Sequence, residues 1–139
     1  MSDAPRPRPL PNLAELDTRP FWEAAKQHEL RYQVCTACGG VVFYTRRHCP
    51  HCMSFDLRWE TSKGEGAVYT FTIIRQIGHP FFRTRAPYVV ALIDLDEGFR
   101  LMSHVMVDKD AVDSVAIGQR VRVAWEDYDD VSLPVFTPL

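Results

Sequence analysis

The sequence contains no apolar run of the roughly 18–20 residues that a membrane-spanning helix needs. It also lacks the apolar core of a secretory signal, because residues 1–12 are rich in proline and arginine. We therefore expect a cytoplasmic protein without a membrane segment. Thiols stay reduced in that compartment, where paired cysteines usually bind a metal ion.

An excess of basic charge is absent as well. The chain has 16 lysines and arginines against 18 aspartates and glutamates, which gives a net charge of -2. Proteins whose main task is to bind phosphate backbones are more often basic, so this balance lowers the expectation of a nucleic-acid partner. The apolar fraction of 46% and the charged fraction of 24% are those of an ordinary folded chain.

Motifs of common active sites are also missing. The sequence has no G-x-S-x-G, no H-E-x-x-H and no phosphate-binding glycine loop. Asp94, Asp96 and Glu97 lie together, but a turn before Gly98 explains them better than a pair of catalytic carboxylates. We predict no catalytic residues, and hence no enzyme activity of the chain on its own.

Four cysteines are present, in two C-x2-C pairs separated by ten residues. Each pair can turn two thiolates toward one point, and two such turns form the tetrahedral set that zinc prefers. Four thiolates leave no open position for water, so we expect one structural zinc ion per chain. The rival interpretations are two disulfides, independent cysteines, or a rubredoxin-type iron. The predicted ligands are Cys35, Cys38, Cys49 and Cys52, with His48 and His51 as exposed neighbours.

The remaining pattern predicts a mainly β chain. Residues 13–30 have a helical pattern, with Pro20 in the first turn and Phe21 and Trp22 on an apolar side. After residue 65, short alternating segments predict about five strands, which suits an OB-fold barrel. Among them, the apolar run 88–95 predicts burial on both faces. The expected units are a disordered or extended arm (1–17), a helix and lead-in (18–34), a zinc ribbon (35–57) and an OB-fold domain (58–139).

The segment 75–87 interleaves arginines with aromatic residues. Arginine can bind phosphates and an aromatic ring can stack on adenine, which are the two needs of coenzyme A and also of single-stranded nucleic acid. A mobile charged loop and a docking loop are the other interpretations. The candidate CoA-binding residues are Arg75, Phe82, Arg83 and Arg85. The candidate partner contacts are Phe21, Trp22, Phe81 and Phe82, with residues 133–139 as further exposed apolar surface.

The order of motifs resembles a family of acyl-CoA-associated proteins that join a rubredoxin-like zinc ribbon to an OB-fold. The likeness covers about residues 18–127. Two departures concern local turns: Met53 stands where a ribbon often has glycine, and Thr45-Arg46-Arg47 replaces a stretch often richer in proline. The motifs that carry the resemblance are Phe21-Trp22, the two cysteine pairs, Gly64-x-Gly66, Pro87-Tyr88-Val89-Val90, Leu95-Asp96-Glu97-Gly98 and Ile117-Gly118.

The resemblance implies an accessory subunit that forms a hetero-oligomer with a thiolase-superfamily protein, such as a thiolase, a ketoacyl-CoA synthase or a thiolase-like aldolase. Such a subunit stabilises the larger enzyme of acyl-CoA and lipid metabolism, and in some members helps to hold CoA. The alternative is a single-stranded nucleic-acid-binding protein built from a zinc ribbon and an OB-fold. A third hypothesis is an independent CoA-binding enzyme.

Overall fold

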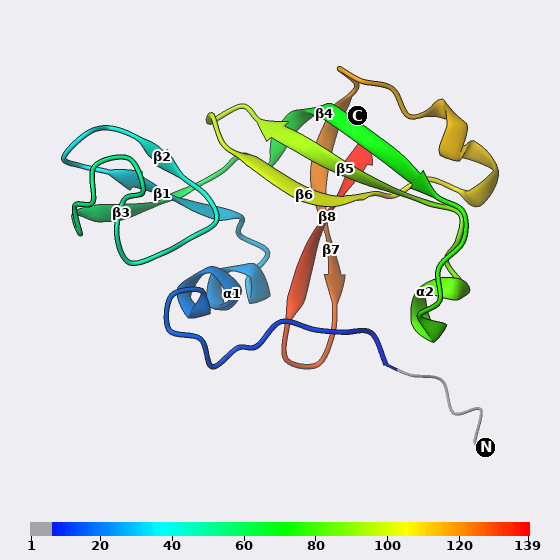
Figure 1. The fold of residues 1–139 in the computed structure, drawn as a ribbon, viewed down its shortest axis with the longest axis horizontal. Helices are drawn as coiled ribbons and strands as arrows, with labels where there is room; N and C mark the ends of the chain where they lie inside the picture. Colours follow the sequence, from blue (N-terminus) through cyan, green and yellow to red (C-terminus); the bar gives the residue numbers. More distant parts are fainter. Residues whose placement is uncertain (1–6) are drawn as a thin grey trace.

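The structure, a computed structural model, describes residues 7–139, so the first six residues of the predicted arm lie outside it. In chain order it contains a short helix, a three-stranded sheet that carries the cysteines, and a closed five-stranded barrel. Figure 1 shows the small sheet at one end of the molecule and the barrel at the other. The predicted fold class, a helix followed by a zinc ribbon and an OB-fold barrel, is confirmed.

The helix α1, Arg19–Lys26, is shorter than the predicted 13–30. Its start agrees with the pattern, because Pro20 lies in the first turn. It ends early because His28 adopts a φ of 62°, a conformation that a right-handed helix cannot include. The hydrogen bonds of the last turn, from Gln27 to Ala24 and from His28 to Ala25, are the short-range kind found at helix ends.

The small sheet places β1 between two antiparallel partners. Its strands are β1 (Arg31–Cys35), β2 (Val41–Val42) and β3 (Leu57–Thr61). The barrel follows the order β4-β5-β6-β8-β7 and closes between β7 and β4. Its strands are β4 (Glu65–Ile74), β5 (Tyr88–Leu95), β6 (Arg100–Val105), β7 (Arg120–Asp127) and β8 (Ser132–Pro138), with the short helices α2 (Pro80–Arg83) and η1 (Lys109–Ser114) between them.

Burial along β5 corrects the expectation that both of its faces are covered. Val89, Ala91, Ile93 and Leu95 point into the barrel and are buried, whereas the residues between them are partly exposed. A closed barrel has one interior, so a central strand can bury only alternate side chains there. The apolar residues on the outer face of β5 are therefore available to line a surface hollow.

The C-terminal residues 133–139 were expected to add exposed apolar surface, and this is wrong for Val135 and Phe136. Residues 133–138 belong to β8, in which Val135 and Phe136 are buried and Phe136 has no exposed area. Pairing of β8 with β7 along seven residues holds this segment in the barrel wall. Pro138 and Leu139, at the end, are exposed, and Leu133, Pro134 and Thr137 are partly exposed.

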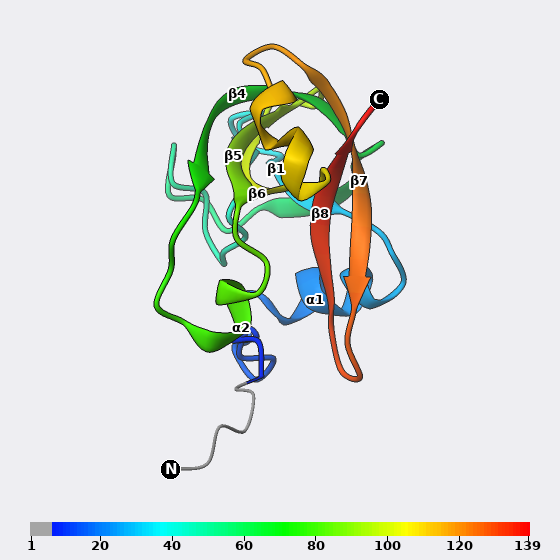
Figure 2. The same cartoon turned by 90° about the vertical axis from the view of Figure 1, so that its right-hand side faces the viewer.

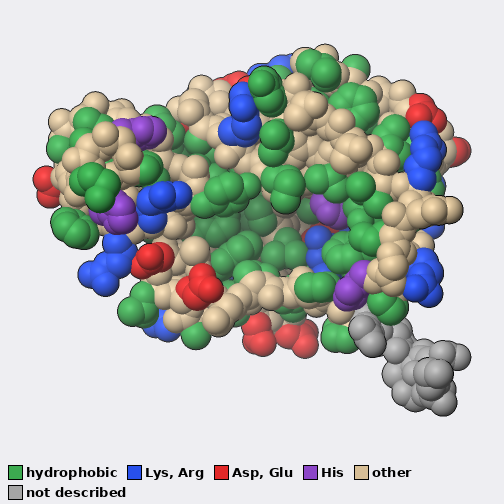
Figure 3. All heavy atoms as spheres, viewed as in Figure 1, with side chains coloured by type: hydrophobic (Ala, Val, Ile, Leu, Met, Phe, Trp, Pro, Cys, Tyr) green, Lys and Arg blue, Asp and Glu red, His purple; other side chains and the backbone are tan. Residues whose placement is uncertain are grey.

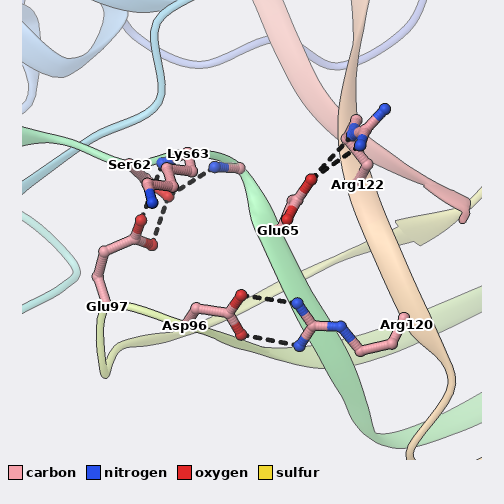
Figure 4. Close-up of polar contacts among 8 residues, drawn as sticks. Ser62, Lys63, Glu65, Asp96, Glu97, Arg120 and Arg122 are labelled. Carbon is pink, nitrogen blue, oxygen red and sulfur yellow. Dashed lines mark hydrogen bonds and ion pairs between the residues drawn. The ribbon is translucent and has the colours of Figure 1, made fainter.

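The acidic turn between β5 and β6 holds the connection from the small sheet to the barrel (Figure 4). Glu97 accepts a hydrogen bond from the Ser62 hydroxyl (2.6 Å) and one from the Lys63 backbone N–H (2.8 Å). Next to it, Asp96 accepts two hydrogen bonds from Arg120, at 2.8 and 2.6 Å. These carboxylates are thus engaged with structural partners.

Candidate metal centre and docking surface

The four cysteine sulfur atoms lie within 4.8 Å of one another. The distance is 3.6 Å from Cys35 Sγ to Cys52 Sγ and 3.7 Å from Cys38 Sγ to Cys49 Sγ. Zinc bound tetrahedrally at about 2.3 Å from each sulfur requires sulfur–sulfur distances of about 3.8 Å, so the set fits one zinc ion. The backbone N–H of Cys38 is the largest influence that lowers the pKa of Cys35 to about 7. The backbone N–H of Ser54 lowers the pKa of Cys52, but burial and the three neighbouring thiols outweigh it and raise that pKa to about 12.

The turns around the cysteines explain the neighbouring residues. A Cβ atom on Gly40 would lie 2.7 Å from the His51 ring, so only glycine fits there. The His51 ring lies 3.3 Å from the Val41 carbonyl oxygen, and His51 is not among the converging ligands. Met53 adopts a φ of 67° in the second turn, which is the conformation that favours the glycine often found at this position.

A surface pocket of about 370 Å³ lies where the arm, α1, the loop after β2 and the barrel meet. We call it the junction pocket. Figure 3 shows the corresponding hollow, in which hydrophobic side chains gather between the two ends of the molecule. Its lining is mainly apolar and comes from segments far apart in sequence. The main lining residues are Trp22, Phe43, Tyr44, Val90, Leu101, Met102, His104, Leu133 and Val135.

The pocket lies beside the shortest strand pairing of the barrel. Strands β6 and β8 pair in parallel at a single position, Val105 with Phe136. Beyond that position, the Met102 backbone N–H donates to the Tyr44 hydroxyl at 3.0 Å, so a ribbon side chain replaces a strand partner. Both residues remain exposed, Tyr44 at 55% and Met102 at 61%, and they lie next to each other at the pocket.

His104 lies at the edge of this pocket and stacks on the Tyr88 ring, with 5.0 Å between the ring centroids. Burial lowers the pKa of His104, and the positive charges of Arg8 and Arg85 lower it further against the opposing effect of Glu126. The imidazole is therefore neutral near pH 7, and the pocket keeps its apolar character.

The predicted CoA-binding residues of segment 75–87 do not point to one place. Arg75 pairs with Asp113 at 2.9 Å, on the η1 helix. Arg83 donates to the Gly78 carbonyl oxygen, within its own turn. Arg85 instead pairs with Glu126 at 2.8 Å, beside Phe82 and Phe81. Arg85 and Phe82 thus both lie next to Phe81, whereas Arg75 and Arg83 have separate partners.

The predicted partner contacts differ in exposure. Phe21 is 7% exposed and packs edge-on against Phe43, so it mainly joins α1 to the small sheet. Trp22, Phe81 and Phe82 are partly exposed. Sequence reasoning missed Arg8, Tyr44, Met102, Glu126 and Tyr128, whose positions depend on contacts between distant segments.

Comparison with known proteins matches both units of the chain. Residues 22–58 match the family described as "ChsH2, rubredoxin-like zinc ribbon domain", and residues 59–126 match "ChsH2, C-terminal OB-fold domain". A DUF35 domain-containing scaffold protein of Methanocaldococcus jannaschii is 35% identical over 102 residues, which cover 69% of this chain and 70% of that protein. The chain belongs to the DUF35 family. The pairing of a zinc ribbon with an OB-fold that the resemblance implied is confirmed.

Two further relatives are named as an enzyme subunit or as part of an enzyme. The probable enoyl-CoA hydratase alpha subunit of Thermomonospora curvata is 41% identical over 136 residues, which are 96% of this chain but only 40% of that protein. A solved structure of an Ltp2-ChsH2(DUF35) aldolase contains a chain that is 38% identical, with a TM-score of 0.80 and coverage of 94% of this chain and 98% of that one. Within residues 7–139, no helix has the length and apolarity to cross a membrane.

Proposed function

We propose that this chain is a non-catalytic accessory subunit of an acyl-CoA-processing enzyme of the thiolase type, working in the cytoplasm. The junction pocket carries the proposal, because exposed apolar side chains of Tyr44 and Met102 surround it at the meeting point of three units. Apolar surface of this kind usually marks a protein contact. Support comes from the solved aldolase chain and from the DUF35 scaffold proteins, which match along most of their length.

Several side chains of the types used in catalysis have structural partners in the described residues. The cysteines converge on the metal position. His79 accepts a hydrogen bond from the Phe81 backbone N–H and so caps α2, and His28 pairs with Asp127. His51 lies against the Val41 carbonyl. These roles support a chain that holds an enzyme together while the partner performs the chemistry.

The placement of the arginines also bears on CoA and on nucleic acid. Because Arg75, Arg83 and Arg85 do not converge, we place acyl-CoA in the partner enzyme and give this chain a docking role.

On the barrel, Arg100, Arg120 and Arg122 pair with Asp94, Asp96 and Glu65. Paired arginines attract phosphates less, which disfavours the single-stranded nucleic-acid alternative.

Co-expression tests this function. The chain should be produced together with a thiolase-like protein of the same cell, and the pair should be followed by size-exclusion chromatography and by an acyl-CoA activity assay. We expect co-elution as a hetero-oligomer, with turnover only when the partner is present. Separate elution, together with partner activity and solubility that do not depend on this chain, would contradict the proposal.

A further inference from the structure

The side chain of Arg8, from the N-terminal arm, is enclosed by residues more than seventy positions away. Its guanidinium lies 5.4–5.9 Å from the ring centroids of Phe81, Phe82 and Tyr128, pairs with the Glu126 carboxylate, and is 3.3 Å from the Tyr128 hydroxyl. The side chain is only 8% exposed. We call the group formed by Phe81, Phe82, Glu126 and Tyr128 the arginine cage.

The arginine cage contains a carboxylate, from Glu126, that can stabilise a bound cation. The Glu126 side chain is 15% exposed and accepts Arg8 on one oxygen and Arg85 on the other. Burial alone would raise the pKa of Glu126, but the hydrogen bond from Arg85 and the charges of Arg8 and Arg85 hold it below the ordinary 4.5. The carboxylate thus stays ionised at neutral pH and compensates the enclosed guanidinium.

The three rings and the carboxylate together suit a guanidinium. Arginine is planar and weakly hydrated, so it can stack between aromatic faces while its N–H groups bond a carboxylate in the plane. Lysine carries a compact, strongly hydrated charge and loses more on burial. Pro7 and Pro9, on either side of Arg8, restrict the arm to extended backbone and remove two N–H groups that would need partners.

We infer that the arginine cage is a recognition site for an arginine in a proline-flanked, extended segment, and that Arg8 of the same chain occupies it. The arm is then a strap that ties α2 to the β7–β8 hairpin. Figures 1 and 2 show the arm passing beside α2 in both views. Arg8 also lines the junction pocket, so the strap forms one wall of that pocket.

Hydrogen exchange of the full chain measures whether Arg8 fastens the strap. Arg8→Ala should speed amide exchange in residues 79–86 and 126–131 by about tenfold or more, since a buried charge-assisted contact is lost. Arg8→Lys should recover little of the protection. Arg6→Ala is the matched control, because Arg6 also stands between two prolines, and it should leave the exchange unchanged.

Chemical rescue separates recognition from general charge. Millimolar methylguanidinium added to the Arg8→Ala chain should restore protection, whereas methylammonium at the same ionic strength should not. In the unaltered chain, the rings should shift the Arg8 Nε–H proton resonance upfield, and Phe82→Leu should reduce that shift. Equal effects of Arg6→Ala and Arg8→Ala, equal rescue by both cations, or an unshifted Arg8 resonance would each overturn the inference.

Discussion

At the scale of single residues, the cysteines show how local chemistry specifies a site. Cys35 and Cys49 are fully buried and Cys38 and Cys52 are exposed, yet their sulfur atoms converge. An apolar core cannot replace them, because only Val42 and Leu57 accompany the buried cysteines in this small cluster. The cysteine end of the ribbon should therefore depend largely on the metal, whereas Tyr32, Phe43 and Trp59 pack with the main core.

Removal of one ligand tests this dependence. The unaltered chain should contain about one zinc ion, and Cys38→Ala should bind zinc far more weakly, because three thiolates no longer complete the tetrahedron. Elemental analysis and a zinc-chelator titration measure both values. Amide exchange in residues 31–61 should rise while that in the barrel changes little. Full zinc retention by Cys38→Ala, or iron in the unaltered protein, would contradict the prediction.

The cysteine ligands could be predicted from the sequence because their spacing is local and chemically specific. The pair of Arg8 and Glu126 could not, because 118 residues separate them and neither has a signature in its own neighbourhood. Phe82 was also only partly predictable. The sequence indicated it as a candidate contact residue, but not that it would contact Arg8 of the arm.

At the scale of elements, the connection between β3 and β4 fixes how the ribbon meets the barrel. Glu97 holds Ser62 and Lys63, and Gly64 follows with a φ of 76°. A Cβ atom on Gly64 would lie 2.3 Å from Val123 Cγ1, on the neighbouring strand β7. Glycine is thus required at this position both for its conformation and for the close approach of β7.

Gly64→Ala should lower the free energy of unfolding by about 2–4 kcal/mol, because it combines an unfavourable φ with an overlap in the barrel wall. Gly118→Ala is a matched control, since Gly118 has a φ of 86° but open space around its Cα. It should cost only about 1 kcal/mol. Urea unfolding of both variants gives the comparison, and equal losses would show that the contact with Val123 is unimportant.

The barrel strands could be predicted because each strand buries alternate side chains inside the barrel, and this gives alternating apolar residues in the sequence. The length of α1 was not, since the apolar pattern continues to Leu30 while the φ of His28 ends the helix. The exposed outer face of β5 was also missed. An apolar run indicates burial, but it cannot distinguish burial inside a barrel from a partly exposed face that lines a pocket.

At the scale of the whole molecule, the junction pocket combines surfaces that no single unit has. Trp22 comes from α1, Tyr44 from the ribbon and Met102 from the barrel. Each is ordinary in its own segment, and the patch exists only when the three units are assembled. A partner that binds there contacts all three units at once, so binding requires the folded chain. A short peptide motif of this chain would not provide the same surface.

The last prediction concerns this patch. Trp22→Ala should weaken assembly with the proposed thiolase-like partner by about 2 kcal/mol or more if the indole is a buried anchor. Met102→Glu should weaken it as well, by placing a charge in an apolar contact. Ile117→Ala is the control, because Ile117 is 70% exposed and does not line the pocket. Titration of the purified partner with each variant gives the dissociation constants.

Trp22 also packs against the chain's own core, so its loss could act through folding. Met102 separates the two effects, because its side chain is exposed in the isolated chain and Met102→Glu should leave the melting temperature nearly unchanged. A weaker complex with an unchanged melting temperature places the partner on the junction pocket. If Met102→Glu binds as tightly as the unaltered chain, or Ile117→Ala weakens binding equally, the partner docks elsewhere, because a charge cannot be buried in an apolar contact without a cost.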